Sequence, residues 1–319
     1  MSYQLDNKMV IGISARALFD MSYENEIFET KGLEAYRKYQ VEHEQDILRP
    51  GPGFGLVQAL LRLNQCAKEA YVEVVIMSRN SADTSLRVFH SIEHYGLQIT
   101  RAALVSGASL APYLTAFQVD LFLSAYEDDV QYAIDNGIAA GVICTKNASK
   151  VVCYGKMEQG EGKAEQSCWN LTDDESQIRI AFDGDAVLFT DESEQIFKNK
   201  GLEAFESSEK ENAIYPLKDG PFANFLRKLS RLQERFPYEE CPIRTALVTA
   251  RSAPAHERVI RTLRTWKVRL DEAFFLGGVE KKEFLKAFGA QIFFDDQSVH
   301  TISASTVVPA ARVPYRRRA

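Results

Sequence analysis

The sequence of 319 residues has little cysteine, and its cysteines form no recognisable pattern. They are odd in number, scattered and without a C-x-x-C pair: Cys66, Cys144, Cys153, Cys168 and Cys241. Such a set argues against a disulfide framework and against a cysteine-based zinc site. It is typical of proteins from a reducing compartment, so we expect a cytoplasmic location.

Two further absences limit the partners of the protein. No stretch approaches the roughly 18 consecutive apolar residues that a membrane-spanning helix needs, and the first ten residues, MSYQLDNKMV, lack the apolar region of a secretory signal. The formal net charge is −6, whereas proteins that bind nucleic acid polymers usually have a basic excess. We therefore expect neither a membrane nor a nucleic acid polymer as a partner.

The apolar residues that are present alternate regularly with helical segments. Hydrophobic residues make up 45% of the chain and charged residues 26%, as in an ordinary globular protein. The expected strands are 9–15, 72–78, 102–107, 119–125, 177–183, 243–249, 272–276 and 291–296. The expected C-terminal helices are 192–207, 220–236, 254–267 and 281–288. This alternation predicts an α/β fold with mainly parallel sheets covered by helices.

The N-terminal and C-terminal parts also match each other without gaps. Segment 14–36, SARALFDMSYENEIFETKGLEAY, aligns with 183–205, DGDAVLFTDESEQIFKNKGLEAF, at an offset of 169 residues, and eight of these 23 positions are identical. Segment 75–125 aligns with 246–296 at an offset of 171 residues. Apolar periodicity alone does not explain matches at polar positions such as Lys31. The alignments indicate two tandem copies of one α/β unit.

The copies are separated by a polar stretch rich in Gly, Glu, Lys and Ser. We expect residues 1–145 to form the first copy, 146–176 a polar linker or exposed hairpin, and 177–319 the second copy. Within the second copy, residues 191–240 are expected to hold two helices that form a small cap.

Two carboxylates, Asp183 and Asp185, follow an apolar run in IAFDGDAVLFTDESE, residues 180–194. Carboxylates at the end of a buried strand are costly unless something pairs them, and a metal ion often does so. An acidic turn between two apolar segments is the alternative. A calcium loop is excluded, because it needs an oxygen ligand and a glycine where this chain has Val187 and Leu188.

The two copies differ at the positions that could carry chemistry. Ser14, Arg16, Ser78, Leu110, Ser124 and Ala125 of the first copy align respectively with Asp183, Asp185, Thr249, Lys281, Asp295 and Asp296 of the second. The second copy thus gathers four carboxylates, a lysine and a hydroxyl at the carboxyl ends of parallel strands, where ligands of open α/β sheets bind. Because the first copy is expected to fold without the carboxylates and the lysine, we interpret these side chains as functional.

Four carboxylates beside one lysine predict a Mg²⁺ site with open positions for a substrate phosphate. An aspartate can attack phosphorus and form an aspartyl-phosphate. A second carboxylate nearby can protonate the leaving oxygen and later activate water. A lysine and Mg²⁺ would offset the negative charge of the phosphoryl oxygens.

The motifs that hold these residues resemble a known enzyme superfamily. FDGDAV after a strand, LVTARS, Lys281 and IFFDD resemble the four motifs of the haloacid-dehalogenase-like phosphatases. The longer segments ISARALFD, FDGDAVLFTDESE, CPIRTALVTARSA and IFFDDQ are similar to the cytosolic 5′-nucleotidase I family, and GLEAYRKYQ, LRPGPGF and HYGLQI extend the match. It covers nearly the whole chain except 145–177. The resemblance implies two haloacid-dehalogenase-like Rossmannoid units, the second catalytic and the first degenerate.

The resemblance also implies roles for individual residues. Asp183 would be the nucleophile, and Asp185 the general acid and base with its backbone carbonyl on Mg²⁺. Thr249 would bind the phosphoryl group, and Lys281 would neutralise the phosphate, with Lys282 and Lys286 as nearby alternatives. Asp296 would be the direct metal ligand, with Asp295 as its close partner. The further candidates for substrate binding are Arg251, Arg79 and Asn80.

The first functional hypothesis is a Mg²⁺-dependent 5′-nucleotidase that hydrolyses nucleoside monophosphates. A phosphatase or phosphotransferase acting on another small phosphate ester is the alternative among enzymes. A non-catalytic nucleotide-binding protein is the alternative from another class. The sequence is compatible with a homo-oligomer but does not determine the oligomeric state.

Overall fold

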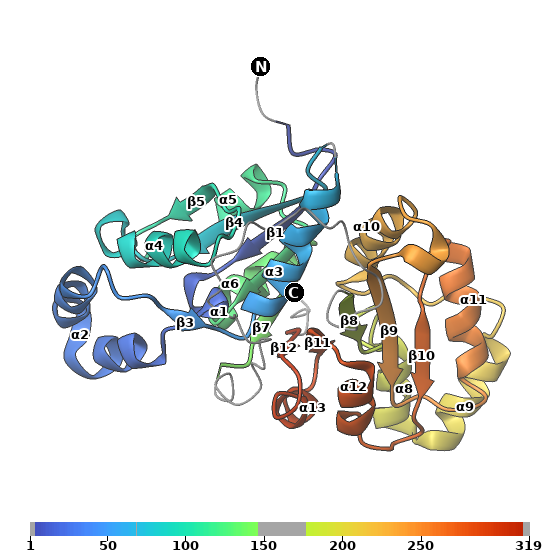
Figure 1. The fold of residues 1–319 in the computed structure, drawn as a ribbon. Helices are drawn as coiled ribbons and strands as arrows, with labels where there is room; N and C mark the ends of the chain where they lie inside the picture. The colour runs from blue at the N-terminus through green and yellow to red at the C-terminus, as the bar shows by residue number, and fades with distance from the viewer. Residues whose placement is uncertain (1–3, 68, 146–176, 315–319) are drawn as a thin grey trace.

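A computed structural model of the protein describes residues 4–67, 69–145 and 177–314. A ten-stranded sheet runs through the whole molecule in the order β10-β9-β8-β11-β12-β7-β6-β1-β4-β5 (Figure 1). The central strands are buried along their length, as β1 and β4 illustrate, because helices cover both faces of the sheet. The α/β class with a mostly parallel sheet is therefore confirmed.

The first half of the sheet has the order β5-β4-β1-β6-β7, and these neighbours are all parallel. Its strands are β1 (Met9–Ile13), β4 (Val72–Ser78), β5 (Arg101–Leu104), β6 (Leu121–Ser124) and β7 (Ala139–Ile143). Its helices are α1 (Ala15–Leu18), α2 (Ser22–Glu42), α3 (Phe54–Arg62), α4 (Leu86–His94), α5 (Ala111–Ala116) and α6 (Glu127–Asp135), with 3₁₀ turns η1 (Leu63–Cys66) and η2 (Ala82–Thr84). A small separate sheet pairs β2 (Phe19–Asp20) with β3 (Arg49–Pro50).

The second half has the order β10-β9-β8-β11-β12, again with parallel neighbours. Its strands are β8 (Ile178–Phe182), β9 (Ile243–Thr249), β10 (Glu272–Phe275), β11 (Ile292–Asp295) and β12 (Ala310–Arg312). Its helices are α8 (Glu192–Lys200), α9 (Leu202–Glu211), α10 (Ala223–Gln233), α11 (His256–Trp266), α12 (Lys282–Phe288) and α13 (Ser298–Ala304), with the 3₁₀ turn η4 (Tyr238–Glu240). When the five strands of each half are numbered by their position along the chain, both halves have the spatial order third, second, first, fourth, fifth.

All eight strands expected from the sequence are present, with ends that differ by at most three residues. The sequence did not predict β7 and β12, which join the halves. These two strands pair antiparallel, with Ala311 opposite Ile143. A glycine at position 141 makes the approach possible, because a Cβ there would lie 2.8 Å from the Cβ of Ala311. The carboxyl ends of the two sets of parallel strands therefore lie at opposite edges of the sheet.

One hydrophobic cluster contains buried residues of both halves, and a second, smaller cluster lies within the second half. The ring of Phe182 on β8 stacks on Phe294 of β11 with centroids 5.7 Å apart, and Phe222 packs on Phe294 at 4.5 Å. On the surface, Lys228 of α10 forms an ion pair of 2.5 Å with Asp120, which precedes β6. The shared cluster and the Lys228–Asp120 ion pair hold the second half against the first.

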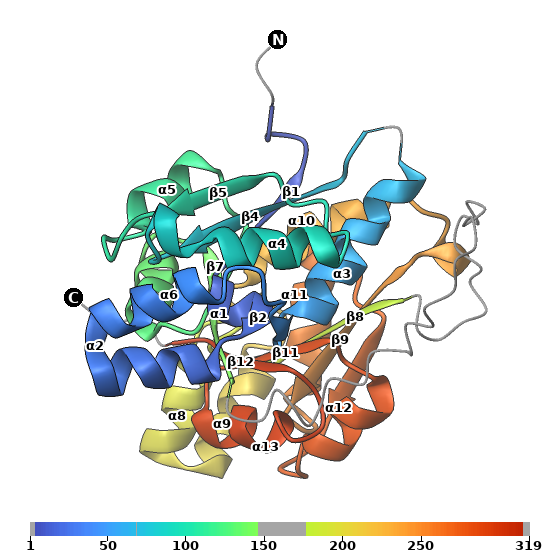
Figure 2. The ribbon, with the colours of Figure 1, turned by 60° about the vertical axis from the view of Figure 1, so that its left-hand side comes forward.

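Each half has a bent helical element at its carboxyl-end edge. In the first half α2 consists of two arms that meet at Gly32, with φ 82° and ψ −179° (Figure 2). In the second half α8 and α9 meet at Gly201, with φ 82° and ψ −177°. Only glycine adopts this backbone region without strain. The glycine therefore sets the bend between the two arms in each half.

The range expected to form a cap, 191–240, contains α8, α9 and α10. In α8 and α9 the buried residues are Ser193 and Glu209, whereas most of the residues that α10 buries are apolar. The expected linker, 146–176, lies outside the described residues, and the expected domain boundaries stay predictions. No helix in the described part of the chain is both long and apolar enough to cross a membrane.

Candidate active site

Three neighbouring strands of the second half end at one point and bring polar side chains together. Asp183 follows the last residue of β8, Thr249 ends β9 and Asp295 ends β11. Because β8 lies between β9 and β11 in parallel register, these positions are adjacent in space. The N–H of Asp183 donates to the carbonyl of Phe294, which fixes the end of β8 beside the end of β11.

Asp183, Asp295 and Asp296 form an acidic cluster. One carboxylate oxygen from each lies within 4.8 Å of the others. Asp183 and Asp295 are buried, with residue exposures of 5% and 0%. Three carboxylates so close together repel one another and lose hydration, so the cluster needs positive charge nearby.

Lys281 at the N-terminus of α12 supplies one positive charge to the acidic cluster. Its Nζ lies 2.8 Å from Oδ1 of Asp183 and 2.7 Å from Oδ2 of Asp295. Of the three lysines that the sequence left open, Lys281 is thus the one that reaches the cluster. Asp295 also accepts a hydrogen bond of 2.8 Å from the N–H of Gln297, and Nδ1 of His300 lies 3.1 Å from its Oδ2. Asp295 is therefore held from three sides.

The acidic cluster carries more negative charge than Lys281 offsets. Burial raises the pKa of Asp183 to about 7, against the attraction of Lys281. Burial and the neighbouring carboxylates raise the pKa of Asp296 to about 8. Although burial acts to raise it, the pKa of Asp295 is lowered by the hydrogen bond with His300 and the charge of Lys281. A bound cation would stabilise the ionised forms of Asp183 and Asp296.

Asp185 is not part of the acidic cluster and pairs with Arg251. The guanidinium donates from Nε to Oδ2 at 2.8 Å and from Nη2 to Oδ1 at 2.7 Å. Burial acts to lower the pKa of Arg251, but the carboxylates of Asp185 and Glu209 raise it above its ordinary value. The structure therefore brings Asp185 and Arg251 together in an ion pair that is separate from the acidic cluster.

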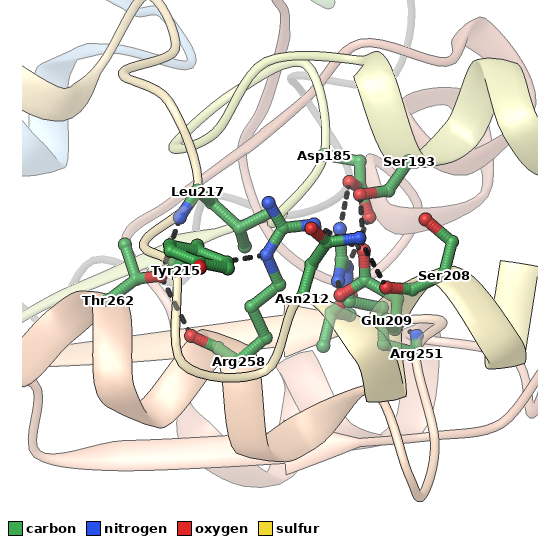
Figure 3. Close-up of polar contacts among 11 residues, drawn as sticks. Asp185, Ser193, Ser208, Glu209, Asn212, Tyr215, Leu217, Arg251, Arg258 and Thr262 are labelled. Atoms are coloured by element: carbon green, nitrogen blue, oxygen red, sulfur yellow. Dashed lines mark hydrogen bonds and ion pairs between the residues drawn. The ribbon is translucent and has the colours of Figure 1, made fainter.

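Figure 3 shows that the Arg251 pair continues into the bent helix pair through Glu209 of α9. Glu209 Oε2 lies 2.6 Å from Nη1 of Arg251, and its Oε1 accepts from Arg258 at 2.9 Å and from the Ser193 hydroxyl at 2.7 Å. Glu209 is 1% exposed. This buried network ties α8, α9 and α11 to the loop after β9, which carries Arg251.

Sequence reasoning missed Glu209 and His300. Glu209 is one of several acids in the segment LEAFESSEKE, and nothing local distinguishes the buried one from the solvated ones. His300 follows the Asp295-Asp296 pair by one helical turn, which is the only signal that could have pointed to it.

Thr249 lies beside the turn that carries Asp183 and Asp185. Its Oγ1 accepts a hydrogen bond of 3.2 Å from the N–H of Arg251. A Cβ on Gly184 would lie 3.2 Å from the same Oγ1, so glycine at this position leaves room for the hydroxyl. The structure thus brings Thr249 next to the Asp-Gly-Asp turn.

Arg79 and Asn80 lie at the end of β4 in the first half. Arg79 donates to both oxygens of Asp129, from Nε at 2.8 Å and from Nη2 at 2.7 Å. Both Arg79 and Asn80 line a cavity whose lining residues do not include the acidic cluster. The structure therefore does not bring them together with Asp183.

Comparisons with known proteins agree with the resemblance read from the motifs. A family model described as 5′-nucleotidase matches residues 1–319. Human cytosolic 5′-nucleotidase 1B is 36% identical over 323 residues, covering 98% of this chain and 50% of the relative, so the chain spans about half the length of that curated protein. A chain from the "Structure of Pnkp1/Rnl/Hen1 complex" gives a TM-score of 0.31 at 12% identity over 97% of this chain and 96% of that one, which is too weak to inform the fold. The chain belongs to the 5′-nucleotidase family.

Proposed function

We propose that the protein is a Mg²⁺-dependent 5′-nucleotidase that hydrolyses nucleoside 5′-monophosphates to nucleoside and phosphate through an aspartyl-phosphate intermediate. The observation that carries the proposal is the buried Asp183, held 2.8 Å from Lys281 at a strand end where two further carboxylates converge. Membership of the 5′-nucleotidase family supports the substrate class and a phosphoric monoester hydrolase activity. The name of the human relative supports a cytoplasmic location.

The acidic cluster fits a hard divalent cation. Its donor atoms are all carboxylate oxygens, which Mg²⁺ prefers, and two of its carboxyl groups have a raised pKa that a cation would reverse. Asp183 and Asp296 would hold the ion together with the backbone carbonyl of Asp185, and Asp295 would support them. When bound, the ion would offset the negative charge on the phosphoryl oxygens.

The proposed reaction has two steps. A carboxylate oxygen of Asp183 attacks phosphorus, the bond from phosphorus to the 5′-oxygen breaks, and Asp185 gives its proton to the leaving oxygen. Asp185 then takes a proton from water, the water oxygen attacks phosphorus, and the bond to Asp183 breaks to release phosphate. Lys281 and the Thr249 hydroxyl would hold the phosphoryl oxygens during both steps.

Arg251 donates to both carboxylate oxygens of Asp185, so neither oxygen is free to contact the leaving group in this arrangement. We therefore expect Arg251 to leave Asp185 when substrate binds and to contact the substrate phosphate, for which a planar guanidinium is well suited. This exchange gives Arg251 the predicted role in substrate binding. Arg79 and Asn80 lie in the first half, where a direct role in the same reaction has no geometric support.

For the fold, the proposal is two tandem haloacid-dehalogenase-like units, of which the first (1–145) is degenerate and the second (177–319) catalytic. The identical strand order of the two halves supports it, as do the glycine bends at Gly32 and Gly201. In this proposal 146–176 is a linker and 191–240 holds the cap. The first unit would have a structural role, because it shares the core of the second.

A panel of phosphate esters assayed with and without Mg²⁺ tests the proposed function. We expect chelator-sensitive phosphate release that is fastest with nucleoside 5′-monophosphates and absent from Asp183→Asn. Transfer of phosphate to added nucleosides would identify a phosphotransferase, and a preference for other esters would identify a different phosphatase. Nucleotide binding without any phosphate release in the presence of Mg²⁺ would refute the enzyme and leave a nucleotide-binding protein.

A further inference from the structure

The first half of the molecule contains a cavity of about 650 Å³ at the carboxyl-end edge of its strands. It lies between α2 and the segments that follow β1, β4 and β6, and all its lining residues belong to the first half. Its volume is within the range of small-molecule sites in proteins. The cavity therefore lies at the carboxyl-end edge of the first half. In the second half, the equivalent edge carries the acidic cluster.

Arg16 gives this cavity a positive charge without an internal partner. It aligns with Asp185 of the second half, and its guanidinium lies over the ring of Tyr126, 5.2 Å from the centroid. Among the described residues no carboxylate forms an ion pair with it. The other charged side chains that line the cavity are paired: Arg37 with Asp83, Arg79 with Asp129 and Glu24 with Arg87.

Asn80 adds a hydrogen-bond donor to the same cavity. It aligns with Arg251 of the second half. Its side chain lies close to the Tyr36 hydroxyl, yet its buried Nδ2 has no acceptor in hydrogen-bonding geometry within the described part of the chain. A buried N–H group without an acceptor is unfavourable, so an acceptor on a ligand would stabilise it.

Part of the cavity lining is apolar and open to solvent. Phe28 and Leu33, from the two arms of α2, are 47% and 56% exposed although both line the cavity. Aromatic rings of Tyr36 and Tyr126 also line it. Exposed large apolar side chains beside aromatic rings are suited to cover a flat ring.

We propose that this cavity binds a small compound in which a planar ring carries an anionic group, either a phosphate or a carboxylate. The anion lies at Arg16 and Asn80, and the ring lies against Phe28 and the tyrosines. The two halves of the sheet would thus bind opposite charges at equivalent carboxyl-end edges, a cation at Asp183 and an anion at Arg16. This site does not depend on the chemistry proposed for the second half.

Calorimetric titration of the full-length chain in the presence of a chelator tests the proposal. The probes are phenylphosphonate and benzoate, with methylphosphonate as an anion that has no ring. We expect one of the two ring compounds to bind with a Kd on the order of 1 mM or tighter. Arg16→Gln and Asn80→Asp should each weaken that binding by roughly tenfold or more, since they remove or oppose the attraction for the anion.

Arg264→Gln, the same change at an exposed arginine of α11 in the second half, is the matched control and should leave the affinity unchanged. Tighter binding of phenylphosphonate would identify a phosphate site, and tighter binding of benzoate a carboxylate site. Equal affinity of the wild type and both first-half variants would overturn the proposal, as would methylphosphonate binding as tightly as the ring compounds. Failure of both ring compounds to bind would also refute it. Thermal unfolding of each variant would show that it is folded.

Discussion

The two halves of the molecule have the same strand order but different side chains at their carboxyl-end edges. Where the second half has Asp183, Asp295 and Lys281, the first has Ser14, Ser124 and Leu110, which are almost completely buried. The first half therefore folds with neutral side chains at the positions that hold buried charges in the second. Because buried charges are costly and the architecture does not need them, the acidic cluster is best explained by function.

The neighbouring positions reverse the sign of the charge. In the second half Asp185 is neutralised by Arg251, which is itself held by Glu209. In the first half Arg16 and Asn80 occupy the aligned positions, and Gln40 aligns with Glu209. Under the two proposals, one architecture would carry a cation site in one half and an anion site in the other, and a few side chains at the strand ends would make the difference.

Replacing the proposed nucleophile should give the largest difference between the halves. Asp183→Asn is nearly isosteric, and we expect it to lower the rate of phosphate release by on the order of 10⁴-fold or more, because it removes the attacking carboxylate. Ser14→Ala, at the aligned position, should lose about 1 kcal/mol of stability as a helix cap and keep its activity. Phosphate-release assays and thermal unfolding measure both. Comparable turnover by Asp183→Asn and the wild type would contradict the assignment.

The buried network around Glu209 should give the next largest effect. Glu209→Gln leaves Arg251 and Arg258 beside a neutral amide, and breaking a buried ion pair in this way typically costs about 3–5 kcal/mol. Gln40→Ala removes only a neutral hydrogen bond to Tyr36, for which we expect about 1–2 kcal/mol. Chemical denaturation measures both free energies of unfolding. If the two variants lost the same stability, the network would not distinguish the halves.

Metal binding should stabilise the protein through the second half alone. Mg²⁺ at one hundred times its Kd should raise the free energy of unfolding by about 2.7 kcal/mol if it binds only the folded state. Asp296→Asn should abolish most of this gain, whereas Asp128→Asn, an exposed acid of the first half, should keep it. Thermal unfolding with and without Mg²⁺ gives the answer. An equal gain in both variants would place the ion elsewhere.

The glycine bends should give the smallest effect, and it should be the same in both halves. A Cβ at Gly32 or Gly201 meets no atom within 4 Å, so alanine adds backbone strain without a clash. We expect Gly32→Ala and Gly201→Ala each to cost about 1–3 kcal/mol, and Ser208→Ala in α9 to change stability by less than about 0.5 kcal/mol. Denaturation curves measure the free energy of unfolding of each variant. A loss of stability in only one of the two glycine variants would contradict this prediction.

Most of the parallel sheet was predictable because its strands are short, mainly apolar segments rich in β-branched residues, as in VEVVIMS and IRTALVT. The joining strands were not, since AAGVI and AAR are short and rich in alanine and glycine. Such segments have weak strand propensity. Their assignment depends on a partner far away in the sequence, and that pairing also sets the opposite directions of the two halves.

The sequence by itself determined the alternation of strands and helices, the matching registers of the two parts and the positions of Asp183, Asp185, Thr249, Lys281, Asp295 and Asp296. These are local properties, because apolar period and motif spacing lie within short segments. Only the tertiary structure decided that Lys281 is the lysine at the acidic cluster, that Asp185 pairs with Arg251, and that Glu209 is buried. Such partners come from separate elements, and their charge and burial depend on distances that no local pattern encodes.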